Sequence, residues 1–199
     1  NVKVKRNNIN WNLDLSEGID LSIYLFGKFD PLIIDMAKAL NLRKKINIID
    51  IGANIGSHTI NFAKEFKSAK IFAIEPTDYS FKKLKKNINL NNKYKKRIFT
   101  TQAFITNKSK IPNSVYSSWK LDSRERKHNL HYGIKKNTKL AIKISLDKFI
   151  KKNNLSNNIL IKCDVDGYEL DVLKSGESYL KKYKPPILLE LAPYLYNEH

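Results

Sequence analysis

A glycine-bearing turn carries the clearest chemical signal in the sequence. It spans Asp50-Ile-Gly-Ala-Asn-Ile-Gly-Ser57, between an apolar run and residues with helical spacing. Gly52 and Gly56 let the backbone approach a ligand closely, and the helix N-terminus presents free N–H groups to a carboxylate or a phosphate. Asp50 can accept a hydrogen bond from a ligand amine. Asn54 stands where a dinucleotide site requires glycine, so a ligand with an amino acid end fits better than one with two phosphates.

An acidic residue, Glu75, ends the next predicted strand, about twenty residues after the turn, and Pro76 follows it. A carboxylate at this place can bind both hydroxyls of a ribose. The turn and the acid together indicate a nucleoside that carries an amino acid, which is S-adenosylmethionine. The cofactor-binding residues that we predict are Asp50, Gly52, Ala53, Asn54, Gly56, Glu75, Pro76, Ala103 and Asp164.

A third signal is the acidic run that ends a later strand, Ile161-Lys-Cys-Asp-Val-Asp-Gly-Tyr-Glu169. Asp164 is the best candidate for a residue close to the transferring methyl group. Asp166 or Glu169 orients an acceptor hydroxyl, or else caps the following helix, and for Glu169 we prefer the cap. Glu190, after the last strand, points toward the same rim.

A base near the acceptor hydroxyl would assist the reaction. The candidate catalytic residues are Asp164, Asp166, His128 and His131. His58 has a structural role in this interpretation, and Cys163 is a buried, inert thiol. The acidic cluster is able to hold Mg²⁺, but nothing requires it, so we predict no metal ligands.

Alternating strand and helix patterns predict a doubly wound α/β fold with a mainly parallel sheet. Strands are expected over 46–51, 70–75, 97–104, 158–165 and 187–191, and helices over 59–66, 77–90 and 168–174. Residues 46–199 form the main domain, with an inserted acceptor-side segment at 106–143. That segment either surrounds the ligand or covers a sheet edge. It is followed by a strand over 138–144, and Asp147 caps the next helix.

Residues 1–45 are expected to form a lead-in that packs on this domain. Alternation around Trp11 predicts a strand, and Asp30-Pro31 is typical of a helix start. The buried face of that helix is predicted from its spacing as Ile33, Met36, Ala37 and Leu40.

The chain is strongly basic, with 37 Lys and Arg against 19 Asp and Glu, a net charge of +18. This charge indicates either a nucleic-acid partner or a compositional bias. Only five of the basic residues are arginine, which favours the bias. Many lysines are expected on outer helix faces, namely Lys82, Lys83, Lys85 and Lys86. A nucleic-acid partner is therefore not expected, although it stays open.

The sequence shows no leader and no apolar run long enough to span a membrane. Its single cysteine excludes an internal disulfide framework. These features predict a soluble protein in the reducing cytoplasm. They do not indicate an oligomeric state.

These motifs resemble the FkbM-type S-adenosylmethionine-dependent methyltransferases. The residues that carry the resemblance are the turn at 50–57, Glu75-Pro76, Ser145-Leu-Asp147, the run 162–173, Leu188-Leu-Glu190 and the lead-in segments 13–21 and 27–30. The resemblance implies a class I methyltransferase fold and O-methylation of a small molecule or of a sugar on a glycan. Carried over by position, Asp50, Gly52, Asn54 and Gly56 hold the methionine part, and Glu75 holds the ribose.

Two features depart from this family. Asp166 stands where the family often has glutamate, which shortens the reach of the carboxylate. The chain also ends at His199, eight residues after Leu191, so the expected fold lacks the closing strands. Either this is a shortened variant or part of the protein is absent. Two alternatives to a small-molecule enzyme follow: an RNA-directed methyltransferase, and a truncated, non-catalytic binding module.

Overall fold

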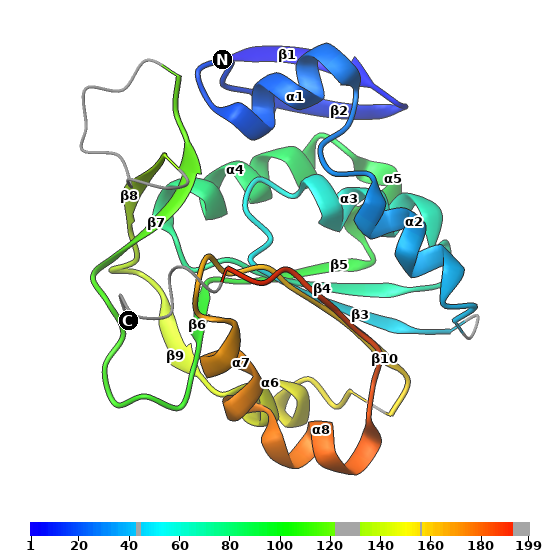
Figure 1. The fold of residues 1–199 in the computed structure, drawn as a ribbon. Coiled ribbons are helices and arrows are strands. Elements are labelled where there is room, and N and C mark those ends of the chain that lie inside the picture. The colour runs from blue at the N-terminus through cyan, green and yellow to red at the C-terminus, as the bar shows by residue number, and fades with distance from the viewer. Residues whose placement is uncertain (43–44, 122–131, 156, 193–199) are drawn as a thin grey trace.

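A five-stranded parallel sheet forms the centre of the molecule (Figure 1). The computed structural model describes residues 1–42, 45–121, 132–155 and 157–192. The strand order is β11-β10-β3-β4-β5, and all neighbours in the sheet are parallel. The strands are β3 (Asn47–Ile51), β4 (Lys70–Ile74), β5 (Ile98–Thr101), β10 (Ile159–Cys163) and β11 (Ile187–Leu189). Their carboxyl ends therefore share one edge, as the sequence predicts.

Helices cover both faces of this sheet and bury two separate cores (Figure 1). Ile48 and Ile49 are neighbours on β3 but belong to different cores, because successive side chains of a strand point to opposite faces. The first core is covered by α2 (Leu32–Ala39), α3 (Ser57–Glu65), α4 (Asp78–Asn89) and α5 (Asn92–Lys95). The second is covered by α6 (Leu146–Lys152), α7 (Glu169–Ser175) and α8 (Glu177–Tyr183).

The lead-in adds β1 (Val2–Arg6), β2 (Ile9–Leu13) and α1 (Gly18–Phe26) outside the α4 layer (Figure 1). The two strands form an antiparallel hairpin, and Trp11 is fully buried in the first core. The Asn87 side-chain oxygen, on α4, accepts a hydrogen bond from the backbone N–H of Asn12 at 2.8 Å. The hairpin of residues 1–13 thus packs against α4.

The segment after β5 differs from its prediction. A single strand was expected over 97–104, but the chain breaks at Gln102, whose side chain bonds to Asp78 at 2.6 Å. The next strand, β6 (Ala103–Ile105), leaves the main sheet and pairs with β9 (Ile142–Ile144). Between them, β7 (Ser114–Trp119) and β8 (Gly133–Asn137) form an antiparallel pair that shows no periodicity in the sequence.

Tertiary contacts correct two local expectations, the buried face of α2 and the exposure of Lys83. Ala37 is buried as predicted, but Met36 and Leu40 are 46% and 43% exposed, and Ile34 takes the buried place. The buried face of α2 is therefore rotated from the predicted one. Lys83 is buried rather than on an outer face, because α1 lies against it and supplies the Asp20 carboxylate.

Asp147 also acts differently from its expected local cap. The Ser145 hydroxyl caps α6 by accepting from the Lys148 N–H at 3.2 Å. The Asp147 carboxylate accepts from Ser178 N–H at 3.3 Å and Tyr179 N–H at 2.9 Å, in the first turn of α8. It therefore joins α6 to α8 in the helix layer that covers the second core.

Candidate active site

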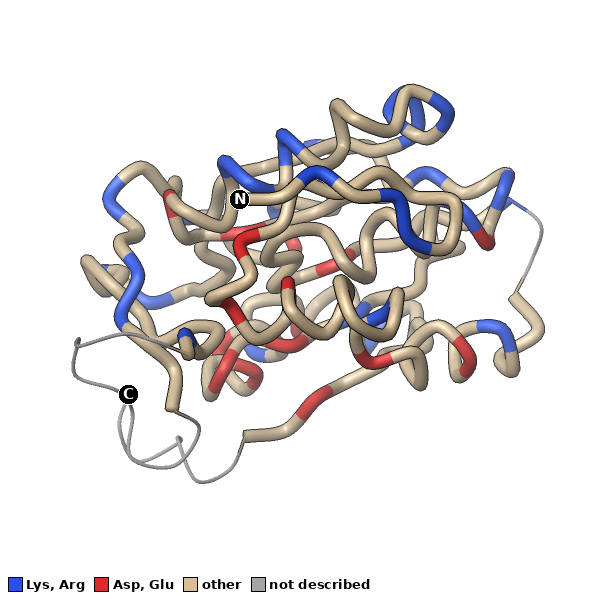
Figure 2. Tube along the Cα trace, turned by 90° about the horizontal axis from the view of Figure 1, so that it is seen from above, with Lys and Arg blue, Asp and Glu red and all other residues tan. Residues whose placement is uncertain are grey.

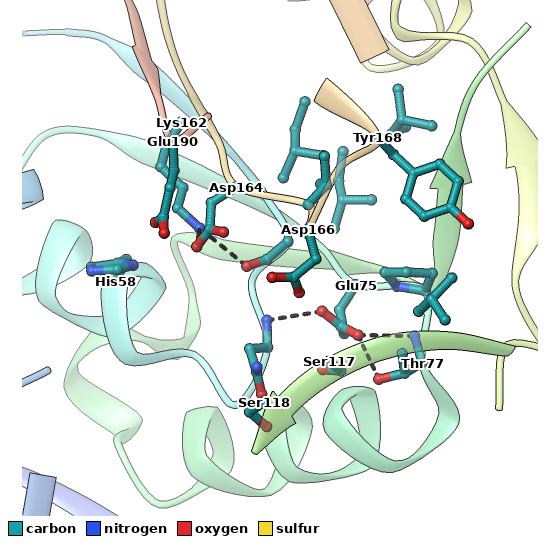
Figure 3. Close-up of a pocket in the computed structure, with 18 of the residues that line it drawn as sticks. His58, Glu75, Thr77, Ser117, Ser118, Lys162, Asp164, Asp166, Tyr168 and Glu190 are labelled. Atoms are coloured by element: carbon teal, nitrogen blue, oxygen red, sulfur yellow. Dashed lines mark hydrogen bonds and ion pairs between the residues drawn. The ribbon is translucent and has the colours of Figure 1, made fainter. Parts of the chain in front are cut away.

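A cavity of about 250 Å³ opens at the carboxyl edge of the sheet (Figure 3). It lies at the end of β3, where the strand order reverses. The chain continues from β3 to β4 and β5 on one side, and β10 and β11 are later added on the other side of β3. Ligands of open α/β folds bind at such a switch point. The predicted residues on its wall are Gly52, Asn54, Glu75, Pro76, Ala103, Asp164 and Asp166.

The glycine turn is shaped by a close backbone contact. Gly52 has a φ of +78°, and a Cβ there would lie 1.8 Å from the carbonyl oxygen of Asp164. Gly56 has a φ of +92°, and a Cβ would lie 2.8 Å from Leu84. Both positions exclude other residues, because the left-handed backbone and the missing space each disfavour a side chain.

The N–H groups of this turn are less available than the sequence predicts. Gly52 and Ala53 both donate to the carbonyl of Ile74 at 3.0 Å, and Gly56 donates to Ala53 at 2.8 Å. Asn54 donates to Glu75 Oε2 at 2.9 Å. The expectation that these amides are free for a ligand is therefore wrong, and the turn is held by its own bonds.

Asn54 lines the cavity and carries a buried side-chain oxygen that has no partner within the described part of the chain. Its φ is +48°, which asparagine tolerates better than most residues. Its side-chain Oδ1 is buried and has no hydrogen-bond partner among the described residues. A buried acceptor without a partner is costly, so a donor on a ligand, such as an ammonium or a hydroxyl, would satisfy it.

Glu75 supports the turn as well as lining the cavity. Its Oε1 accepts from the N–H and the hydroxyl of Thr77 at 2.9 and 2.6 Å, beside the Asn54 bond to Oε2. Burial raises the pKa of this carboxyl, while the Thr77 bonds oppose the rise. Two carboxylate oxygens offer about four acceptor sites. Three are used, which leaves capacity for a ligand hydroxyl.

Asp50 lies behind the wall rather than on it. It is fully buried, accepts from the Thr59 hydroxyl at 2.5 Å and lies 3.5 Å from Lys162 Nζ. The expected direct contact with a ligand amine is therefore wrong for this arrangement. Ala53 and Gly56 are likewise outside the cavity lining.

Lys162 is the functional residue that the sequence reasoning left without a role. It is 1% exposed on β10, and its Nζ lies 3.1 Å from the Gly52 carbonyl and 3.0 Å from Asp164 Oδ2. Burial lowers its pKa, but the carboxylates of Asp164 and Asp50 outweigh this and raise it above its usual value. A lysine inside an apolar strand was the available signal, since such a charge needs a buried partner.

Asp164, Asp166 and Glu190 form an acidic wall that adjoins the glycine turn (Figure 3). Burial, followed by the charges of Asp164 and Glu190, raises the pKa of Asp166 to about 7. The Asp164 charge, followed by burial, raises the pKa of Glu190. Asp166 can therefore exchange a proton with a ligand near neutral pH.

The neighbouring groups hold this wall in place. Glu169 is 1% exposed, and its Oε1 accepts from Gly167 N–H at 3.0 Å and Val165 N–H at 3.4 Å. It therefore holds the loop before α7 rather than capping that helix, which has no side-chain cap bond. Cys163 is buried, and burial raises its thiol pKa, so it is not a nucleophile.

Of the four histidines, one lies at the cavity and three lie outside the described residues. His58 lines the cavity, packs between Phe29 and Phe62, and lies 3.2 Å from the Asp30 carbonyl. Burial, followed by the Lys162 charge, lowers its pKa, so the ring is neutral. His128 and His131 lie outside the described residues.

Neither a metal site nor a membrane-spanning helix is present in the part of the chain that the structure describes. No three His, Cys, Asp or Glu side chains within it are grouped as a metal ion requires. None of the helices within it has the length and apolar character needed to cross a bilayer.

The remaining wall is the one that the sequence did not predict. It consists of Val115, Tyr116, Ser117, Ser118 and Trp119 on β7, together with two residues of the lead-in. Of the two proposed roles for segment 106–143, β7 thus takes the one beside the ligand cavity. Its position could not be read from spacing, because β7 pairs only with β8 and carries no helix or sheet period of its own.

The fold and the cavity together define a Rossmann-like class I methyltransferase. Residues 50–198 match the model of the methyltransferase FkbM domain. The chain belongs to this family, and with it to the S-adenosylmethionine-dependent methyltransferases. No match was found among the curated proteins.

Solved methyltransferase structures resemble parts of the chain. TYW2 of Pyrococcus horikoshii in complex with MeSAdo is 29% identical, with a TM-score of 0.36, over 50% of this chain and 34% of its own. A transferase from the same organism gives 28% and 0.36 over the same shares. PKMT2 of Rickettsia typhi in complex with AdoHcy gives 13% and 0.35, over 78% of this chain and 22% of its own. The chain thus spans about a third or less of these proteins.

Proposed function

We propose that this chain transfers the methyl group of S-adenosylmethionine to a hydroxyl of a sugar or another small molecule. The observation that carries the proposal is the contrast between two adjoining walls of one cavity. A glycine turn with an orphaned Asn54 oxygen and the Glu75 carboxylate forms one wall, and the Asp164–Asp166–Glu190 group forms the other.

The first wall suits the cofactor. Asn54 Oδ1 would accept from the ammonium of the methionine part, and the remaining acceptor site of Glu75 suits one ribose hydroxyl. Ile74, Ala103 and Phe104 line an apolar part of the cavity that suits the adenine ring. Bound there, the cofactor supplies a methyl group on a positively charged sulfur.

The second wall suits the acceptor. Asp166, with a pKa of about 7, would take the hydroxyl proton as the acceptor oxygen bonds to the methyl carbon. The carbon–sulfur bond would break, its electron pair would stay on sulfur, and S-adenosylhomocysteine would leave. Lys162 holds Asp164 in place by its 3.0 Å contact.

Calorimetric titration with S-adenosylhomocysteine tests the cofactor site. We expect binding with a raised unfolding temperature, and absence of both at millimolar ligand would contradict the proposal. Labelled S-adenosylmethionine with fractionated host extracts then identifies the acceptor fraction. Binding without transfer to any fraction would favour the non-catalytic module.

An RNA acceptor is the second candidate, and one surface favours it. Figure 2 shows Lys and Arg around much of the periphery of the molecule. On α4, α5 and their junctions, exposed lysines stand at Lys82, Lys85, Lys86, Lys93, Lys95 and Lys96. If this surface binds RNA, affinity will fall steeply with salt. Weak, salt-insensitive binding would remove this candidate.

We also propose that residues 46–199 form the catalytic domain and that residues 1–45 complete its acceptor side. The cytoplasm is the proposed location. A single, buried, reduced cysteine supports it, because a reducing compartment keeps thiols free.

A further inference from the structure

Trp119 occupies an unusual place at the mouth of the cavity. It lines the cavity and is 41% exposed, whereas the other tryptophan, Trp11, is 2% exposed in the core. A large aromatic surface left in contact with water is unfavourable unless a partner covers it. The β7–β8 register shifts between Tyr116 and Trp119, and such a bulge re-aims the side chains beside it.

A glycine of the lead-in forms the seat of this indole. A Cβ at Gly18 would lie 2.1 Å from Trp119 Cε2 and 2.3 Å from Cζ2. The ring therefore lies directly against the backbone at the start of α1. Since a methyl group cannot fit between them, any larger residue at this position would displace the indole.

The strand that carries Trp119 is fixed by a buried polar cluster. Lys136 Nζ, on β8, lies 2.9 Å from Glu17 Oε2 and 2.9 Å from Ser118 Oγ, and Ser118 Oγ donates to Glu17 at 2.9 Å. Lys136 and Glu17 side chains are only 5% and 4% exposed. The N–H of Leu121 also donates to the Ser16 carbonyl at 2.7 Å. The indole is thus held rigidly before any ligand arrives, which lowers the entropic cost of binding.

The polar residues that line the same cavity select the kind of ring that the indole can hold. Among the described residues of the lining, Lys162 is the only lysine or arginine, and it already contacts Asp164. Asp164, Asp166 and Glu190 would repel a phosphate and accept hydroxyl donors. A neutral ring with an apolar C–H face and several hydroxyls satisfies both the indole and the carboxylates.

We propose that Trp119, seated on Gly18, is the stacking platform for a neutral sugar ring and determines which acceptors the enzyme accepts. This rests on the proposed function for its catalytic consequence. The binding itself does not depend on methyl transfer. The lead-in thereby selects the acceptor.

Fluorescence titration of the whole chain with methyl hexopyranosides tests the platform directly. We expect a saturable change in tryptophan emission with the glycosides and none with glycerol, which has no ring face. The change must disappear in Trp119→Phe, since Trp11 is then the only remaining indole. No saturable change in the wild type, or a full change in Trp119→Phe, would overturn the proposal.

Kinetics with the acceptor fraction separates the platform from the proposed function. We expect Trp119→Ala and Gly18→Ala to raise the acceptor KM roughly five- to tenfold, with S-adenosylhomocysteine affinity unchanged. Trp119→Phe should have an acceptor KM close to the wild-type value. Tyr183→Ala, equally exposed on α8, is the matched control. An unchanged acceptor KM in Trp119→Ala would refute the platform, whereas absent S-adenosylhomocysteine binding in the wild type would refute only the proposed function.

Discussion

The two walls of the cavity are stabilised in opposite ways. On the glycine-turn wall, the polar groups bind one another, as in the bonds from Asn54 and Thr77 to Glu75. On the acidic wall, burial followed by the Asp164 and Glu190 charges raises the pKa of Asp166, and the Asp164 charge followed by burial raises the pKa of Glu190. The first wall is therefore built to stay fixed. The second stores electrostatic repulsion that a proton relieves, as a proton-accepting site requires.

Replacing Asp166 should produce the largest change. Asp166→Asn is expected to slow methyl transfer by roughly 10²–10⁴-fold, because the amide cannot accept the hydroxyl proton. The wild-type rate should rise with pH and level off above about 7, where the carboxyl is ionised. Steady-state assays from acidic to alkaline pH measure both effects. A variant with the same rising limb would show that another group is the base.

The stability of this same variant provides its control. The folded pKa of Asp166 is raised from 3.8 to about 7, so the stability it contributes is complete below pH 4 and is lost as pH rises through 7. Asp166→Asn should therefore unfold at a higher temperature than the wild type at pH 8, and the gain should vanish near pH 4. A variant that is less stable at pH 8 would contradict the repulsion assigned to this wall.

Removing the buried Lys162 ammonium, which contacts both walls, should lower the free energy of unfolding. Lys162→Met leaves Asp50 and Asp164 without their shared partner, and the expected loss is roughly 3–5 kcal/mol in the free energy of unfolding. Urea unfolding measures it. Adding Asp50→Asn should recover part of the loss. A single variant as stable as the wild type would mean that the lysine does not link the walls.

The glycine-turn wall should respond through binding. Glu75→Gln places an amide NH₂ against the N–H groups of Asn54 or Thr77, so we expect S-adenosylhomocysteine affinity to fall roughly 10–100-fold. Calorimetry measures the change. Glu177→Gln, on the exposed face of α8, is the control and should bind like the wild type. Unchanged affinity in Glu75→Gln would separate this acid from the cofactor.

The smallest expected effect is at Asn54. Asn54→Gly removes the orphaned oxygen but tolerates the φ of +48°, so affinity should fall only about three- to tenfold while stability barely changes. Asn54→Ala should lose roughly 1–2 kcal/mol more in stability, because alanine disfavours the left-handed backbone. Calorimetry measures the change in affinity, and thermal unfolding measures the change in stability. Equal affinity for Asn54→Gly and the wild type would exclude a ligand contact by Oδ1.

The cofactor side of the molecule was largely readable from the sequence. The glycine turn, Glu75 and the strands around them are specified by residues within about twenty positions of one another, which is the range over which strand–turn–helix patterns act. The pattern could not show which groups bind the amides of the turn. It predicts free N–H groups, but the Ile74 carbonyl and the Glu75 carboxylate accept hydrogen bonds from them. The partner of a backbone group depends on the neighbouring strand, which local spacing does not specify.

The acceptor side was decided by contacts between distant segments. The sequence by itself determined the parallel sheet, the turn at its edge and the carboxylates that end its strands, because periodicity and turn chemistry are local. Only the tertiary structure brought Gly18 beneath Trp119 and Glu17 to Lys136, buried Lys83 against Asp20 and exposed Met36. These pairs lie tens of residues or more apart, or depend on which neighbour covers a helix. Such contacts follow from how the layers pack and leave no period in the chain.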